Sequence, residues 1–250
     1  MILLTFNIFK PENLKTDGSK FSDEELYKII AQNTNAVLRI LENHDVKATF
    51  FIEISIAENN AEFLKKIISK GHEVAFYNKG SSVKETENAK TFVEKFLEKP
   101  VRGIRQKDTG LTVEEIKSLE FTYISKIEDS NLLFLIRRLQ RTTEIIEIQG
   151  VSIVPESISP YLQLPYNDFI FQMVPMQYYQ NMVFESVNNS EFVQIYLDIN
   201  QFTDFQQVKL RIPFYRKYNS GKKMEDKLEE FLSFINKKEL AVSRMKDYII

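Results

Sequence analysis

The sequence predicts an α/β protein built around a parallel β-sheet. Three observations predict this fold class. Strand-like and helix-like segments alternate up to residue 125, and connections of a few residues join them. Several of the strand-like segments are apolar on both faces, which is typical of strands covered by helices. The 250 residues, of which 43% are hydrophobic, are enough for a substantial core. The alternation alone leaves open whether the sheet closes into a barrel.

The first half of the chain contains the clearest elements. Strands are expected at 3–10, 46–54, 73–77, 101–105 and 121–125. Ser22 with Glu25 and Thr112 with Glu115 form capping-box patterns, which mark the starts of two helices. Further helices are expected at 61–71, with Gly71 in the C-cap position, and at 84–98, before Pro100.

Past residue 140 the alternation is less regular. Residues 143–157 resemble one or two strands, and 157–171 is interpreted as a loop rich in aromatic residues and proline. A helix at 176–187, a strand at 192–199 and a helix at 224–235 are expected after it. No glycine- or serine-rich linker divides the chain, so a single domain over 1–250 is the simpler expectation.

Composition excludes several classes of function. The formal net charge of −2 gives no field that would recruit nucleic acid or an anionic membrane, so no nucleic-acid partner is expected. The absence of cysteine excludes disulfides and thiolate chemistry. His44 and His72 are each expected to have structural roles. No segment has the length of a membrane span, and no signal peptide is evident, so a cytoplasmic location is expected.

The first strand raises a chemical question. Its carboxyl end carries Asn7 and Lys10, at a place where α/β enzymes usually have a carboxylate. With seven glycines, the chain has no glycine-rich phosphate loop, and no G-x-S-x-G elbow is present. Nucleotide binding and ordinary serine hydrolysis therefore have no motif support.

Three segments resemble the polysaccharide deacetylase family, which has the NodB-homology domain and is carbohydrate esterase 4-like. "LLTFN" resembles a family strand that ends in T-F-D, and "NHDVKATFF" resembles H-G-V-K-A-T-F-F and is followed by "GHEV". "KPVRGIRQKD" (99–108) resembles P-V-R-G-Y-R-A-P, and the tail is similar to the C-terminal extension of the exopolysaccharide-associated branch, which falls within 140–250. The resemblance implies an irregular (β/α) barrel and metal-dependent hydrolysis of N-acetyl groups on sugar polymers.

The active residues of the family are replaced in this chain. The resemblance places the general base at Asn7, a metal-binding aspartate at Lys10, and the two metal-binding histidines at Tyr77 and Ser81. The orienting arginine is retained as Arg105, and the late catalytic acid falls on Asp198. An amide has no useful basicity, an ammonium repels a divalent cation, and neutral oxygens are weak substitutes for imidazoles. No metal cofactor is therefore expected, and the chain is interpreted as catalytically inactive.

Other roles remain open. The leading hypothesis is a barrel that binds a saccharide through Lys10, Tyr77, Ser81, Arg105 and Asp198, with Tyr161 and Tyr166 as additional groove residues. Lys10 would lie near the former metal position and pair with Asp198 or an anionic sugar. A scaffold that binds a polysaccharide-assembly protein is a related hypothesis.

The alternative is an active hydrolase with metal-independent chemistry. Asp198 would be its base, and Lys10 and Arg105 would stabilise developing charge. Glu53 and Asp108 are further acids near predicted strand ends.

Overall fold

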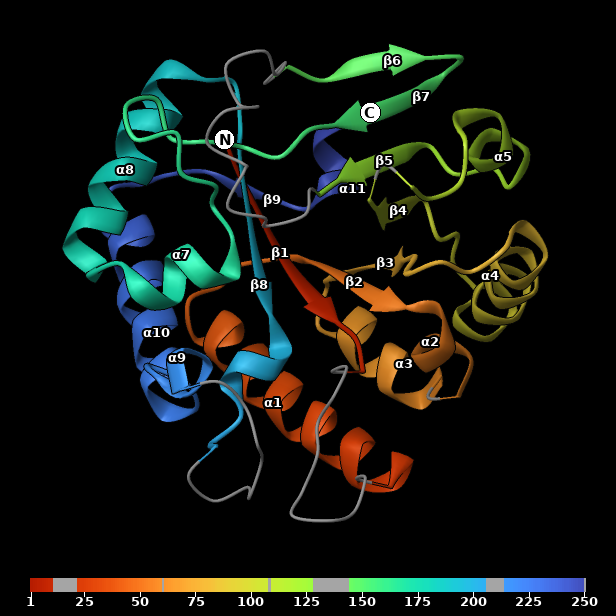
Figure 1. Ribbon diagram of the computed structural model, residues 1–250, viewed down its shortest axis with the longest axis horizontal. Helices are drawn as coiled ribbons and strands as arrows, with labels where there is room; N and C mark the ends of the chain where they lie inside the picture. The colour runs from red at the N-terminus through yellow and green to blue at the C-terminus, as the bar shows by residue number, and fades with distance from the viewer. Residues whose placement is uncertain (11–21, 60, 108, 128–143, 206–213, 250) are drawn as a thin grey trace.

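The computed structural model describes residues 1–10, 22–59, 61–107, 109–127, 144–205 and 214–249 (Figure 1). Asp108, named above as a candidate acid, lies outside them. The strands are β1 (Ile2–Ile8), β2 (Thr49–Glu53), β3 (Glu73–Tyr77), β4 (Gly103–Gln106), β5 (Tyr123–Lys126), β6 (Ile146–Ile148), β7 (Val151–Val154), β8 (Val193–Asp198) and β9 (Val242–Ser243). The helices are α1 (Asp23–Asn43), α2 (Ile54–Asn59), α3 (Ala61–Ser69), α4 (Val83–Leu97), α5 (Val113–Ser118), α7 (Asp168–Met173), α8 (Met176–Asn189), α9 (Phe214–Lys217), α10 (Lys222–Lys237) and α11 (Met245–Tyr248), with a 3₁₀ turn η2 (Ile199–Phe202).

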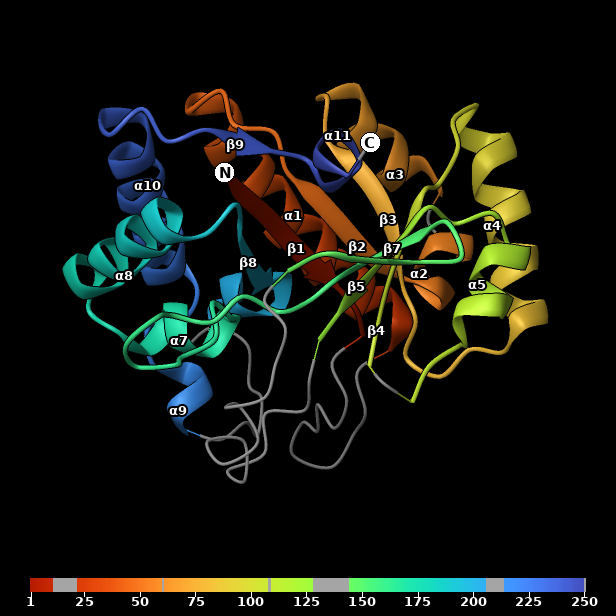
Figure 2. The same cartoon turned by 90° about the horizontal axis from the view of Figure 1, so that it is seen from above.

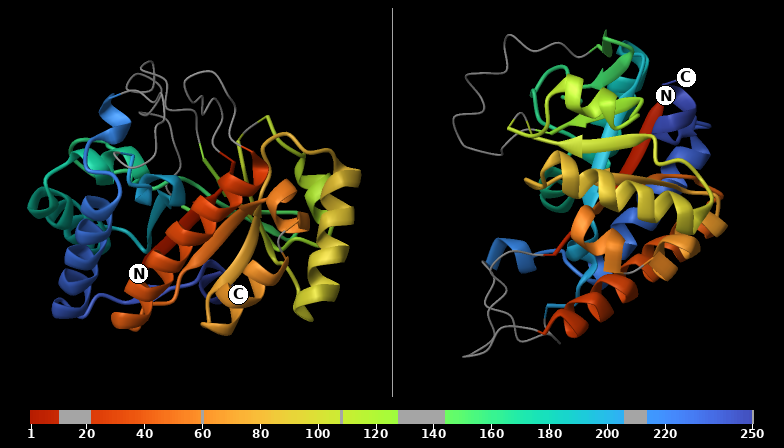
Figure 3. Two further views of the ribbon diagram at one scale, coloured as in Figure 1. Left: turned by 90° about the horizontal axis from the view of Figure 1, so that it is seen from below. Right: turned by 90° about the vertical axis from the view of Figure 1, so that its right-hand side faces the viewer.

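The described strands form one curled sheet in the order β6-β7-β5-β4-β3-β2-β1-β8, and β9 pairs with the start of β1. All pairings are parallel except the β6–β7 hairpin. Helices α10, α1, α3 and α4 lie along one side of the sheet (Figure 3), where α1 packs against α10 and α3 packs against α4. The predicted α/β class is confirmed, and the barrel is a half-barrel with β6 and β8 at its ends. The single-domain organisation stays a prediction, although β8 lies directly beside β1.

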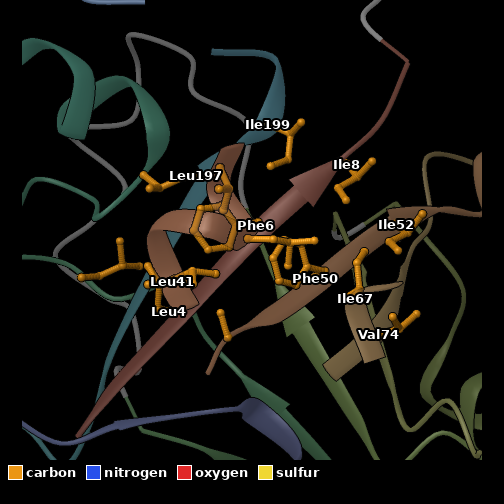
Figure 4. Packing of buried hydrophobic residues seen from close by; sticks show 14 of the residues in the cluster. Leu4, Phe6, Ile8, Leu41, Phe50, Ile52, Ile67, Val74, Leu197 and Ile199 are labelled. Carbon is orange, nitrogen blue, oxygen red and sulfur yellow. The ribbon is translucent and has the colours of Figure 1, made fainter. Parts of the chain in front are cut away.

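The two faces of β1 differ because successive side chains of a strand point to opposite sides. Leu4, Phe6 and Ile8 join the core between the sheet and the helices, where the Phe6 and Phe50 rings stack at 5.1 Å (Figure 4). The other face carries Leu3, Thr5 and Asn7. That inner face has its own buried cluster, which contains Leu3, Phe51, Ala75, Tyr77, Tyr123, Ile127, Val154, Phe192, Tyr196 and Met245.

Side-chain caps define the starts of three helices. The predicted capping boxes at Ser22 and Thr112 are confirmed, and Ser82 with Glu85 forms a third at α4. The predicted helix at 84–98 therefore begins one residue earlier, at Val83. Each cap satisfies backbone N–H groups that would otherwise lack partners.

The C-terminal segment lies at the amino ends of the strands (Figure 2). The backbone N–H of Met245 donates to Thr49 Oγ1 (2.9 Å), and that of Lys246 donates to Glu73 Oε2 (3.0 Å). Met245 is fully buried there. The polar strand ends considered below are therefore at the opposite, carboxyl edge of the sheet. In the described part of the chain, every helix is too short or too polar to cross a bilayer.

Two tyrosines are buried in the core between the sheet and the helices, and together they test how much a hydrogen bond of a buried hydroxyl contributes to stability. Tyr166 donates from its hydroxyl to the Met182 carbonyl (2.8 Å), whereas the Tyr179 hydroxyl has no partner among the described residues. A buried hydroxyl without a partner costs free energy. We expect Tyr179→Phe to leave the free energy of unfolding unchanged or raise it by up to about 1 kcal/mol, and Tyr166→Phe to lower it by about 1 kcal/mol. Urea unfolding checks both, and a Tyr179→Phe variant less stable than Tyr166→Phe would contradict this reading.

Candidate functional site at the carboxyl edge of the sheet

Arg105 is at the centre of the polar network on the inner face. Its side chain is fully buried. Nη1 donates to Asn7 Oδ1 (2.6 Å), Nη2 to Thr5 Oγ1 (3.0 Å) and Nε to Ser125 Oγ (3.0 Å). The strand register explains this meeting, because β4 places Arg105 beside Ser125 of β5. Arg105 thus holds three strands together through neutral oxygen atoms.

The charge of Arg105 is also stabilised by aromatic rings. The guanidinium carbon lies 3.8 Å from the centre of the Phe51 ring and 5.3 Å from that of Tyr196. Burial lowers the pKa of the Arg105 guanidinium to about 10, so the group is still a cation at neutral pH. No ion pair joins Arg105 to another described residue. Cation–π contacts and hydrogen bonds therefore offset its desolvation.

Asn7 connects Arg105 to an acid on the next strand. Its Oδ1 accepts from Arg105, and its Nδ2 donates to Asp198 Oδ1 at 2.9 Å. The parallel β1–β8 register sets Asn7 directly beside Asp198. Only a side chain with one acceptor and one donor fits both neighbours at once. An ionised aspartate would accept from Arg105 but would repel Asp198.

Asp168 is the second acid of this edge, and sequence reasoning missed it. The backbone N–H of Tyr196 donates to the Tyr166 carbonyl (3.0 Å), so the segment after Tyr166 runs beside β8 and brings Asp168 to Asp198. The two carboxyl groups lie close enough for each to affect the pKa of the other. Asn167 caps α7 by accepting from the Ile170 N–H (2.9 Å). Residues 168–171, predicted as loop, are helical for this reason.

The electrostatics of the Asp168–Asp198 pair favour a shared proton. Burial, followed by the charge of Asp168, raises the pKa of the Asp198 carboxyl well above its usual range. Burial also raises the pKa of Asp168, although hydrogen bonds from the Phe169 backbone and with Asp198 oppose the change. Two carboxylates this close do not both ionise easily.

This shared proton predicts a pH-dependent stability. Because the folded-state pKa values are raised, the native pair loses stability relative to the unfolded chain as pH rises above the ordinary pKa of aspartate. We expect Asp168→Asn to raise the free energy of unfolding by about 1 kcal/mol near neutral pH, with a difference that shrinks toward about pH 4. Asp45→Asn is the control, because the Asp45 side chain is 96% exposed. Urea unfolding across this range checks it, and an equal change in both variants would contradict the shared proton.

Tyr77 lies at the same edge, on β3. Its side chain is buried, with 8% exposed, and its ring meets Phe9 edge-on at 5.8 Å between centroids. Burial and then the charge of Asp198 raise the pKa of its hydroxyl above the usual range. Tyr77 is therefore a neutral phenol at this edge of the sheet.

Lys10 and Ser81, predicted as ligand-binding residues, are not with this group. Lys10 Nζ pairs with Asp23 Oδ2 at 3.1 Å and lies 4.9 Å from the Tyr27 ring centre. The expected pairing of Lys10 with Asp198 is therefore wrong, because the start of α1 supplies a closer anion. Ser81 lies in a turn where its N–H donates to Asn78 Oδ1 (2.7 Å), just before the cap of α4. Whether either residue binds a ligand stays a prediction.

The remaining candidates are placed as follows. Tyr166 is fully buried in the outer core, so its prediction as a groove residue is wrong, whereas Tyr161 is 79% exposed. Glu53 accepts from the Lys10 N–H (2.9 Å) and from Ser55 Oγ (2.9 Å), so both of its oxygens have partners.

His72 accepts from the Ala48 N–H through Nδ1 (3.2 Å), and burial lowers its pKa to about 4. This histidine is neutral and structural.

The residues present at this edge do not fit a divalent metal. Asn7 uses both ends of its amide within the protein, and Tyr77 is a neutral phenol. Over the described ranges, no group of three or more histidine and acidic side chains is arranged to hold a metal ion. Zinc sites are built from thiolate, imidazole and carboxylate ligands. The donor set here is that of a hydrogen-bonding site.

Comparison with known proteins identifies the architecture. Residues 2–106 match the family model described as polysaccharide deacetylase. A probable polysaccharide deacetylase from Pseudomonas aeruginosa PAO1 superimposes with a TM-score of 0.63 at 13% identity, covering 99% of this chain and 89% of that one. The chain has the polysaccharide deacetylase fold. The resemblance of the first part of the chain to the polysaccharide deacetylase family and the predicted barrel type are thereby confirmed, whereas the exopolysaccharide-associated branch stays a prediction.

Two other solved structures share this fold. Puue allantoinase gives a TM-score of 0.64 at 12% identity, over 99% of this chain and 88% of that one. BA3943 from Bacillus anthracis, described as a CE4 family pseudoenzyme, gives 0.54 at 13% identity over 100% of this chain. The chain spans 65% of the length of BA3943. No curated protein sequence matches the chain significantly.

One signal in the sequence would have revealed Asp168. Asn followed by Asp, after a proline-rich loop and before apolar residues, is an N-cap pattern. Thr5 and Ser125 were missed for a different reason. They are small polar residues within strands, and only the alternation of faces along β1 points to an inner polar layer.

Proposed function

We propose that this deacetylase-like protein does not catalyse metal-dependent deacetylation and acts instead by binding a saccharide, or as a scaffold for a polysaccharide-assembly protein, in extracellular polysaccharide metabolism. The observation that carries the proposal is the double engagement of Asn7. Its amide lies between Arg105 and Asp198, with contacts of 2.6 and 2.9 Å. A general base must accept a proton, and an amide held in this way does not.

The replaced metal positions support the same conclusion. Lys10 presents only donors and is paired with Asp23, while Tyr77 and Ser81 provide neutral oxygens. Neutral oxygens bind zinc more weakly than imidazole and carboxylate ligands do. BA3943, which shares the fold, is described as a pseudoenzyme, and a mutant of it is described as having restored enzymatic activity. This precedent supports the idea that the fold persists without catalysis.

Two titrations test the proposal. Calorimetric titration with Zn²⁺ is expected to give no saturable one-to-one binding at micromolar concentrations, with an active metal-dependent deacetylase measured in parallel as the control. Titration with chitotetraose, an N-acetylated amino-sugar tetramer, is expected to show binding. Saturable zinc binding would contradict the proposal that the metal site has been lost. No binding of chitotetraose or of other tetrasaccharides would leave the scaffold role as the only form of the proposal.

A further inference from the structure

The C-terminal end of the chain lies across the amino edge of the sheet, opposite the candidate site (Figure 2). We call residues 241–249 the strap. Its strand β9 has two residues and pairs with the start of β1, and its helix α11 has four. The Met245 side chain is fully buried in the cluster of the inner face, and the Tyr248 ring lies 5.8 Å from that of Phe192. So short an attachment can open locally while the rest of the sheet stays folded.

Glu73 is a buried acid beneath the strap, and the candidate site does not use it. It is only 3% exposed. Its Oε1 accepts from the Tyr123 hydroxyl (2.9 Å), and its Oε2 accepts from Thr49 Oγ1 (2.7 Å) and from the backbone N–H of Lys246 (3.0 Å). Thr49 Oγ1 in turn accepts from the N–H of Met245 (2.9 Å). Two consecutive N–H groups therefore attach the strap to this carboxyl group, one directly and one through Thr49.

Glu73 is buried without a cation to balance its charge. Within the described ranges, no lysine or arginine forms an ion pair with it. The titratable groups that face it are Tyr123 on β5 and Lys246 on α11. Arg244 binds a backbone carbonyl and an acid of α11 instead, and the neutral His72 packs against the helix-covered face of the sheet. Burial raises the pKa of the Glu73 carboxyl, and its hydrogen bonds and the charge of Lys246 offset this only in part.

We propose that Glu73 makes the strap a pH-sensitive closure, which covers the amino edge while the Glu73 carboxyl carries a proton and opens as that carboxyl ionises. A protonated Glu73 still accepts from Lys246 through Oε2, and its proton fits between Oε1 and the Tyr123 hydroxyl, which can accept as well as donate. An ionised Glu73 under the closed strap has lost water without gaining a cation. Opening the strap returns water to the carboxylate, so opening and ionisation favour each other. The open form uncovers the apolar site that Met245 fills.

Amide hydrogen exchange followed by NMR tests the proposal at the N–H groups of Met245 and Lys246. Because burial raises the pKa of Glu73, closure is favoured most below about pH 4 and weakens as pH rises, by at most about tenfold per pH unit for one proton. We expect the wild-type protection factors, corrected for intrinsic exchange, to fall at least about threefold between about pH 5 and about pH 8. Glu73→Gln keeps an acceptor but cannot ionise, so its protection is expected to stay constant. Glu62→Gln, at a side chain that is 83% exposed, is the matched control and is expected to behave as the wild type.

Lys246→Ala gives a second test that does not alter the buried acid. It keeps the backbone N–H that binds Glu73 but removes a charge that favours the ionised carboxylate. The fall in protection is therefore expected to extend to higher pH than in the wild type, and this variant decides the question if Glu73→Gln does not fold. The Asn78 amide, bound to the Arg105 carbonyl (2.8 Å) at the carboxyl edge, is the internal reference and is expected not to follow the strap. Constant protection in the wild type, an equal fall at Asn78, or a wild-type pH dependence in Glu73→Gln would overturn the proposal.

Discussion

Arg105→Met is expected to lower the free energy of unfolding by about 3–5 kcal/mol, because three buried oxygen atoms would each lose a hydrogen-bond donor at a cost of about 1–3 kcal/mol. Methionine fills part of the volume but donates no hydrogen bonds. Asn7 Oδ1 and Thr5 Oγ1 on β1 and Ser125 Oγ on β5 would each lose a donor. The contact with the Phe51 ring, 3.8 Å from the guanidinium, would also lose its charge. Urea unfolding at neutral pH measures the change.

Arg102→Met is the matched control for Arg105→Met. Arg102 is exposed and lies three residues earlier in the same segment. Its substitution is expected to change the free energy of unfolding by less than about 0.5 kcal/mol. If both variants were equally stable, the buried guanidinium would not be what holds β1, β4 and β5 together.

Gly103→Ala is expected to destabilise the fold by about 3 kcal/mol, near the upper end of the cost of overpacking a core. A Cβ atom at this position of β4 would lie 1.9 Å from Cζ of Tyr123. Tyr123 cannot easily move away, because its side chain is fully buried and its hydroxyl donates to Glu73 Oε1 at 2.9 Å. The paired strands β4 and β5 place the two residues directly beside each other.

A double-mutant cycle isolates that clash. Tyr123→Leu removes the ring, so Gly103→Ala is expected to cost less than about 1 kcal/mol in that background. Urea unfolding of the four proteins gives the coupling free energy. An alanine at position 103 that costs the same in both backgrounds would show that the penalty is not steric contact with Tyr123.

The elements of the fold were predictable where local signals are strong. The capping boxes at Ser22 and Thr112 marked two helix starts, and the apolar runs marked β1, β2 and β3. Helix α7 was missed because it has only six residues and follows a proline-rich loop. Propensity gives little information over so short a window. The end of the chain at β9 and α11 depends on long-range contacts with Thr49 and Glu73, which no local pattern encodes.

The candidate site was predictable in part. Asn7, Arg105 and Asp198 were singled out from motif positions, and the structure brings these three together. The direction of Lys10 was not predictable, because its partner Asp23 lies 13 residues further along the chain, at the start of α1. Asp168 lies beside Asp198 because the segment before α7 is joined to β8 by the backbone hydrogen bond between Tyr166 and Tyr196. Such a contact depends on the tertiary fold rather than on spacing in the sequence.

The central claim is our proposal that this chain does not catalyse metal-dependent deacetylation. Acetate release from N-acetylated amino-sugar oligomers tests it most directly, with added divalent metals and, separately, with chelator. No release under either condition is the predicted result. Metal-dependent release would contradict the proposal that Lys10, Tyr77 and Ser81 stand in place of metal ligands. Release that resists chelator would contradict catalytic inactivity and would point to the alternative, a metal-independent hydrolase that uses Asp198.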